Sequence, residues 1–199
     1  MMYSFFFLPL FINKLLDKSQ NCGIVEESLW ERHMRFILAS IILSVFSHIT
    51  LGASLVPNTG YTEEEVNWLV KNVYFESRNQ GIAGQLAVAM VTINRVKDRR
   101  FPNTIKEVVT QAYTYKSGFP IRHRCQFSWY CDGKSDKIFD WETYNDIKNI
   151  VVTYLQNRDI IFDITEGATH YHADYVTPEW RKTKIKTIEI EDHIFYRWG

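Results

Sequence analysis

The stretch N-V-Y-F-E-S-R-N-Q-G-I-A-G-Q-L-A-V-A-M-V-T-I-N-R, from Asn72 to Arg95, decides the fold of this chain. It is typical of a helix end, a glycine-marked turn and the start of a second helix. Glu76 falls on the same helix face as the valine three positions before it and the leucine seven before it. Burial on an apolar face would raise the pKa of this carboxyl into the range of a general acid. The alternative is a glutamate that turns to solvent or pairs with Arg78 or Arg95.

Two helices are predicted around this turn. Thr62 and Glu65 have the spacing of a capping box, so the first helix begins after Thr62 and runs to about Ser77. The second helix is expected from residue 83 to residue 99, where Phe101-Pro102 follows. A short third helix should end near residue 111.

The remaining chain mixes loops, one helix and a hairpin. Residues 112–137 are rich in aromatic and polar groups and are expected to be irregular. Asp140 is placed to cap a helix from about residue 141 to residue 156. Residues 184–198 alternate as strands do, with a turn near Glu191-Asp192, and predict a terminal β-hairpin.

Composition places few limits on function. Lys+Arg and Asp+Glu both number 23, so the formal net charge is zero and nothing suggests a nucleic-acid partner. Aromatic residues make up 15% of the chain, which is enough both to fill a core and to line a binding groove. A neutral, aromatic-rich protein suits a glycan better than a charged polymer.

The front of the chain looks separate from the fold. Residues 36–56 contain no Lys, Arg, Asp or Glu and follow a basic cluster, which is the layout of a signal peptide. We therefore expect residues 34–56 to be a signal peptide or signal-anchor. The protein should then be exported to the periplasm or cell wall. Residues 1–33 are interpreted as an over-extended gene start before Met34, or as a long leader. Residues 57–62 are expected to be a linker, and residues 63–199 the functional domain.

Cysteine and histidine residues leave several chemistries open. Cys125 and Cys131 could form a disulfide in an exported protein or remain free thiols. If free, either could pair with His170 or His193 as a nucleophile. His170, His172 and Asp174 could share one side of a strand, but a complete metal site needs further ligands, and we expect none.

The segment C-Q-F-S-W-Y-C-D-G, which begins at Cys125, carries the side chains that a sugar site needs. Flat aromatic faces meet the C–H face of a pyranose, and amide and hydroxyl groups orient its substituents. The alternative is that Phe127 and Trp129 simply fill the core.

Five motifs in this order resemble a known family. They are V-Y-F-E-S-R-N-Q-G-I-A-G-Q-L-A-V-A-M-V-T-I-N-R-V, F-P-N-T-I, C-Q-F-S-W-Y-C-D-G-K-S-D, G-A-T-H-Y-H and H-I-F-Y-R. Over about residues 65–197 the chain resembles the bacterial cell wall hydrolases of the spore-cortex-lytic type, the SleB family. The resemblance implies a lysozyme-like α+β domain, mainly helical with a small β-hairpin or sheet. It also implies cleavage of the peptidoglycan glycan between N-acetylmuramic acid and N-acetylglucosamine, by a lytic transglycosylase in relatives linked to germination.

The resemblance also implies roles for particular residues. The family motif E-A-R-G-E aligns its first glutamate, the catalytic acid, with Glu76, whereas Gln80 replaces its second glutamate. Peptidoglycan is the implied partner of a monomer that needs no cofactor. The residues implied to bind substrate are Gln126, Phe127, Ser128, Trp129 and Tyr171, with His170 and His193 as supporting residues.

Three mechanisms and three functions stay open at this point. Besides the cysteine nucleophile, Glu76 could act alone or with a second carboxylate. The alternatives to glycan cleavage are an N-acetylmuramoyl-L-alanine amidase and a peptidoglycan-binding module without activity. The candidates for a second carboxylate are Asp132, Asp136, Asp174 and Glu179.

Overall fold

A computed structural model describes residues 55–199. The predicted leader, and all but the last two residues of the predicted signal segment, lie outside the described residues. Within the part described, no helix combines the length and the apolar character needed to cross a bilayer.

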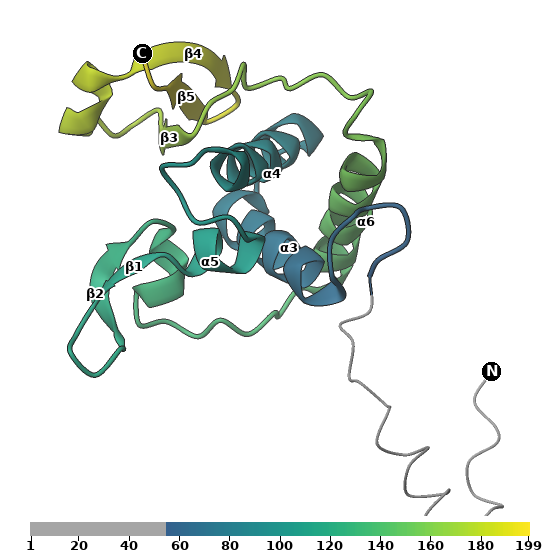
Figure 1. Cartoon of the computed structure of the whole chain (residues 1–199), viewed down its shortest axis with the longest axis horizontal. Helices are drawn as coiled ribbons and strands as arrows, with labels where there is room; N and C mark the ends of the chain where they lie inside the picture. The colour runs from purple at the N-terminus through teal and green to yellow at the C-terminus, as the bar shows by residue number, and fades with distance from the viewer. Residues whose placement is uncertain (1–54) are drawn as a thin grey trace, which may run out of the picture. The chain divides into compact units, whose positions relative to one another are not determined.

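The described chain folds as α+β, as the sequence predicts (Figure 1). Its helices pack together, the β1–β2 hairpin and the three-stranded sheet are two separate sheets, and the three-stranded sheet packs on α4. The elements in chain order are α3 (Glu63–Ser77), α4 (Ile82–Lys97), α5 (Ile105–Thr110), β1 (Ala112–Thr114), β2 (Pro120–Cys125), η2 (Ser128–Cys131), α6 (Trp141–Asn157), β3 (His170–Ala173), η3 (Glu179–Thr183), β4 (Ile185–Ile190) and β5 (His193–Arg197).

Helix α3 is the centre of the helical part. The predicted capping box is confirmed: the Thr62 hydroxyl accepts from the Glu65 amide, and the Glu65 carboxylate accepts from the Thr62 amide. The helix contacts α4, α5 and α6, which buries its apolar face in the main core. Its fully buried aliphatic side chains are Val66, Leu69, Val70 and Val73.

The start of α4 is capped from a distant part of the chain. Gly81 is the N-cap residue and has no side chain to offer. The Glu191 carboxylate, from the β4–β5 turn, accepts from the amides of Gly81 (2.7 Å) and Gly84 (3.3 Å). A methyl group on either glycine would lie 2.8 Å from a Glu191 carboxylate oxygen, so only glycine permits this approach. The cap ties the β4–β5 hairpin to the turn that follows Glu76.

The predicted terminal hairpin is confirmed as β4 and β5. The structure adds β3, which pairs antiparallel with β5 to give the order β3-β5-β4. Tyr171 lies opposite Phe195, which is buried against α4 residues Ala87 and Val91. The sheet therefore holds Tyr171 in a fixed position relative to α4.

The expectation that residues 112–137 are irregular was wrong for half of the segment. Ala112–Thr114 and Pro120–Cys125 pair as a hairpin, and Ser128–Cys131 forms a short 3₁₀ helix. The burial of β1 and β2 shows no clean alternation. A hairpin without one buried face has no period-two pattern for the sequence to display.

Residues 57–62, predicted as a linker, pack against the domain. Thr59 is 1% exposed, and its carbonyl accepts a 2.8 Å hydrogen bond from Arg158. Leu55 forms an isolated antiparallel bridge with Thr62. These contacts join the segment to the α3 and α6 end of the fold.

Candidate active site

Glu76 occupies the last turn of α3, where its carboxyl faces the sheet. The Tyr171 hydroxyl donates a 2.9 Å hydrogen bond to its Oε2 atom. Burial raises the pKa of Glu76, and the Tyr171 hydrogen bond and the charge of Arg95 oppose the rise without cancelling it. The structure thus agrees with the sequence expectation of a carboxyl with a raised pKa on an apolar helix face. Among the ion pairs of the described residues there is none between Arg78 and Glu76, and the Arg78 guanidinium carbon lies over the Tyr74 ring, 5.1 Å from its centre.

No second carboxylate acts on Glu76 among the residues described. Within residues 55–199, the groups that shift its pKa are Tyr171 and Arg95. A carboxylate about 5 Å away, as in a two-carboxylate retaining glycosidase, would raise the pKa by direct repulsion. Of the candidate partners, Asp132 binds the Lys134 amide at 2.8 Å, and Asp136 lies 4.0 Å from Lys71. This arrangement favours a mechanism with one carboxyl group.

Both predicted supporting histidines lie around the Tyr171 strand. The His193 ring lies 5.0 Å from the Tyr171 ring, and burial lowers the pKa of His193. His170 is surrounded by the rings of Phe101, Trp180 and Trp198, and burial followed by nearby cations lowers its pKa to about 4. Both imidazoles are therefore neutral at neutral pH, and neither contacts the Glu76 carboxyl in the hydrogen bonds found.

The predicted sugar-binding segment borders a cavity of about 340 Å³. Trp129 stacks on Phe75 with ring centres 4.8 Å apart, and its indole N–H donates to Asn72 at 2.8 Å. Phe75 precedes Glu76 on α3, but Glu76 itself is not among the residues that line the cavity. The cavity is lined by Phe75, Arg78, Ser128, Trp129, Asp132, Lys134, Ser135, Asp136, Lys137 and Phe139.

Phe127 is a correction to the predicted binding residues. Its side chain is 1% exposed and lies in the main core, so it has no surface to offer a ligand. Gln126 is exposed, and its backbone amide donates a 2.9 Å hydrogen bond to the Gln111 carbonyl. Ser128 and Trp129, both predicted to bind substrate, line the cavity, as does Asp132 of the same segment.

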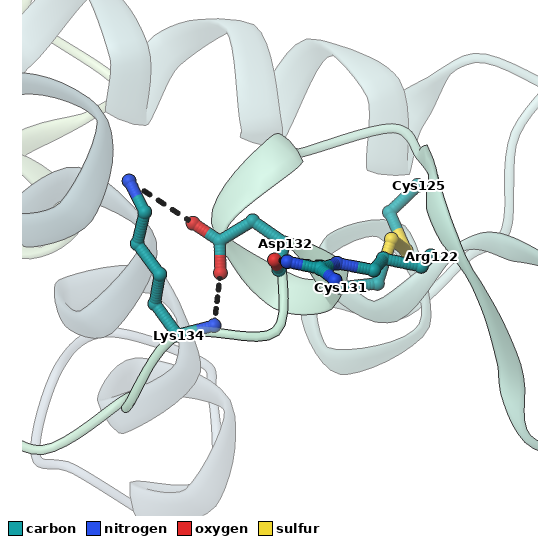
Figure 2. Close-up of a disulfide and its surroundings, with 5 residues drawn as sticks. All are labelled: Arg122, Cys125, Cys131, Asp132 and Lys134. Atoms are coloured by element: carbon teal, nitrogen blue, oxygen red, sulfur yellow. Dashed lines mark hydrogen bonds and ion pairs between the residues drawn. A yellow bond between two sulfur atoms is a disulfide. The ribbon is translucent and has the colours of Figure 1, made fainter.

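Cys125 and Cys131 form the disulfide that the sequence left as one of two alternatives. Figure 2 shows the bridge beside the loop of Asp132 and Lys134, with the Arg122 guanidinium donating to the Asp132 carbonyl at 3.0 Å. The bridge removes both thiols from any nucleophilic role in the oxidised protein. It joins β2 to η2 and so fixes the wall of the cavity that carries Trp129.

Loss of this disulfide should destabilise the domain by about 2 kcal/mol. The bridge closes a short loop and so lowers the conformational entropy of the unfolded chain, and this contribution disappears without it. The measurement is urea unfolding of the double variant Cys125→Ser, Cys131→Ser against the parent chain. Dithiothreitol should lower the stability of the parent and leave the double variant unchanged. Equal sensitivity of both proteins would contradict the assignment.

The amide group of Gln80, the residue that the resemblance aligns with a second glutamate, forms hydrogen bonds through both its nitrogen and its oxygen. Its Nε2 donates to the Asp192 carboxylate at 2.7 Å, and its Oε1 accepts from the Asp192 amide at 3.2 Å. Gln80 therefore connects the turn after Glu76 to the β4–β5 turn, beside the Glu191 cap. The geometry assigns it a structural contact in place of a second acid.

Sequence reasoning missed the burial of two polar side chains, Asn72 and Arg95. Asn72 is 0% exposed and lies four residues before Glu76, where it bridges Trp129 and the Thr92 hydroxyl at 3.2 Å. Arg95 was expected only as an alternative ion-pair partner of Glu76, and its burial, at 5% exposed, was not predicted. An Asn one turn before a candidate acid, on the apolar face, was the available sign of a buried polar network.

Residues 79–196 match the family described as Cell Wall Hydrolase. The chain belongs to this family. The matched segment contains Gln80, Trp129 and Tyr171, and it begins three positions after Glu76.

The chain is also similar to spore cortex-lytic enzymes of two bacteria. The chain is 30% identical over 141 residues to a spore cortex-lytic enzyme of Bacillus cereus, a match that covers 70% of this chain and 46% of that protein. It is 27% identical over 137 residues to a spore cortex-lytic enzyme of Oceanobacillus iheyensis, covering 68% of this chain and 42% of that protein. The chain thus spans a little under half the length of these relatives.

Two solved structures of the family share the fold. The catalytic domain of the germination-specific lytic transglycosylase SleB from Bacillus anthracis matches with a TM-score of 0.53 and 30% identity, over 71% of this chain and 100% of that chain. The catalytic domain of the Bacillus cereus SleB protein matches with a TM-score of 0.51 and 30% identity, over 74% and 100%. These matches confirm the lysozyme-like α+β prediction.

Proposed function

We propose that this protein cleaves the glycan strand of peptidoglycan as a lytic transglycosylase, with Glu76 as its single acid and base. The observation that carries the proposal is the Glu76 carboxyl: its pKa is raised by burial, the Tyr171 hydroxyl orients it, and no second carboxylate acts on it in the described part of the chain. The family and its SleB relatives supply the substrate class.

The reaction needs only one proton-transfer group. Protonated Glu76 gives its proton to the glycosidic oxygen between N-acetylmuramic acid and N-acetylglucosamine as the C1–O bond breaks. The resulting carboxylate then takes the proton of the C6 hydroxyl, whose oxygen bonds to C1 of the same muramic acid. The products are a 1,6-anhydro end and a free 4-hydroxyl, Glu76 is protonated again, and no water is consumed.

The aromatic cavity next to α3 is the proposed sugar site. Phe139 is an exposed aromatic residue in its lining, and Trp129, which is 6% exposed, is a second aromatic residue there. Ser128 and Lys137 are polar residues of the same lining. Its volume of about 340 Å³ is at the small end of ligand pockets, which suits one sugar ring of a longer strand. Tyr171 then acts on the acid and not on the sugar.

The setting of the reaction is also part of the proposal. Peptidoglycan lies outside the cytoplasmic membrane, so the enzyme must be exported, and residues 34–56 are the proposed signal peptide or signal-anchor. The domain would begin at about residue 63 and act as a monomer.

Mass spectrometry of the products from purified peptidoglycan tests the proposal. Muropeptides with 1,6-anhydro ends are the expected result. Reducing ends would show a hydrolase, and released stem peptides would show an amidase. Binding to peptidoglycan without any product would show a binding module and would overturn the proposal.

A further inference from the structure

Arg95 is a buried cation whose presence the fold alone does not explain. Its side chain is 5% exposed, between Phe101 and Phe127, whose ring centres lie 5.3 Å and 4.8 Å from the guanidinium carbon. Burying a charge costs several kcal/mol, and an apolar side chain of similar volume often stabilises a protein as well or better. A charge kept in this position therefore suggests a use for the charge.

The guanidinium is only partly satisfied by its surroundings. Its Nε donates a 2.7 Å hydrogen bond to the Thr169 carbonyl, whereas its Nη1 is buried and has no hydrogen-bond partner among the described residues. Cation–π contacts with the two phenyl rings recover part of the lost hydration. Arg95 forms no ion pair within 4.0 Å in that part of the chain.

The groups that face Arg95 belong to the candidate active site. Glu76 and Tyr171 both act electrostatically on its guanidinium. Thr169, which accepts its hydrogen bond, stands two residues before Tyr171, the residue that donates to Glu76. Burial, and then the charge of Arg95, lower the pKa of His170 to about 4, so this imidazole is neutral at neutral pH. Arg95 is thus the only described cation that acts on Glu76.

We propose that Arg95 is a positioning residue for Glu76. Its fixed positive charge stabilises the carboxylate form of Glu76 relative to the protonated form in the free enzyme. Its hydrogen bond to the Thr169 carbonyl holds in place the strand that carries Tyr171. This role rests on the proposed function, in which Glu76 is the acid. Burial alone favours the neutral carboxyl, and the nearby cation limits that preference. The carboxyl can then donate its proton in one step and remain stable as a carboxylate for the next.

The test compares Arg95→Gln with Arg95→Lys in the full chain. Both side chains can donate to the Thr169 carbonyl, but only lysine keeps the charge. Arg95→Met is a second uncharged variant, whose side chain can fill the space between the two phenyl rings if the glutamine variant does not fold. Arg99→Met is the control, because Arg99 is an exposed arginine just after the same helix.

Two measurements are made on each folded variant: the pKa of Glu76 from carboxyl-carbon NMR titration, and the pH dependence of peptidoglycan cleavage. Loss of the charge should raise the pKa of Glu76 by about one unit and move the alkaline limb of activity upward by the same amount. The lysine and control variants should keep both values close to the parent protein.

Each outcome has a separate meaning. An unchanged Glu76 titration in Arg95→Gln and Arg95→Met, or an equal shift in Arg95→Lys, would overturn the role of the charge. The NMR titration needs no activity, so it is independent of the reaction type. A shifted titration in a protein that shows no anhydro products would support the role of Arg95 and contradict the proposed function instead.

Discussion

Glu76→Gln should lower the rate of glycan cleavage by about 10³-fold or more, because general acid–base catalysis contributes about 10²–10⁴-fold and this carboxyl performs both proton transfers. Glutamine keeps the shape of the side chain and can still accept the hydrogen bond from Tyr171, so the fold should persist. The measurement is the rate of release of soluble muropeptides from purified peptidoglycan, with thermal unfolding to confirm the fold.

The control for this substitution is Glu142→Gln. Glu142 is an exposed glutamate in the first turn of α6, so its variant should keep the parent rate. Binding of Glu76→Gln to insoluble peptidoglycan should also be retained, since the sugar site is intact. A Glu76→Gln protein that keeps more than about a tenth of the parent rate would end the single-acid mechanism.

Gln80→Glu should destabilise the domain by about 2 kcal/mol near pH 8, although the resemblance implies a glutamate at this position. Gln80 donates to the Asp192 carboxylate at 2.7 Å, and a glutamate would place a second carboxylate there. Two carboxylates at hydrogen-bond distance share one proton, which raises a folded-state pKa above its unfolded value of about 4. The stability penalty should therefore be small near pH 4 and should grow as the pH rises through that folded-state pKa.

Thermal unfolding of the parent and Gln80→Glu between pH 4 and pH 8 measures this penalty, which should lower the midpoint by about 5 °C at the upper end. Asp192→Asn in the same chain is the matched rescue, because an amide at position 192 can donate to the new glutamate. The double variant should recover most of the loss. A pH-independent loss, or a loss that the second change does not relieve, would show that the cause is not the carboxylate pair.

Local signals in the sequence were sufficient for the helices. The Thr62 cap, the apolar period of α3 and the Asp140 cap depend on residues a few positions apart, and all three are found. The alternation of residues 184–198 similarly predicted the β4–β5 hairpin, although β4 has no buried residue and the buried side chains belong to β5. The β1–β2 hairpin was missed because neither strand has a buried face with a regular period.

The candidate site could be predicted only in part. Glu76 and Trp129 follow from a helix period and a motif, but the contacts that define them join residues far apart in the chain. The Tyr171–Glu76 bond spans 95 positions, and the Gln80–Asp192 bond spans 112. Phe127 was misjudged because an aromatic residue in a loop has the same sequence signature whether it lines a groove or fills a core.

By itself the sequence determined the helix that carries Glu76, the apolar face on which this carboxyl lies, and the family to which the chain belongs. Only the tertiary structure decided the protonation behaviour of that carboxyl, because its pKa depends on burial, on the Tyr171 hydroxyl and on the Arg95 charge together. Local sequence specifies which groups a helix presents. The dielectric and the charges around them are set when α3, α4 and β3 pack against one another.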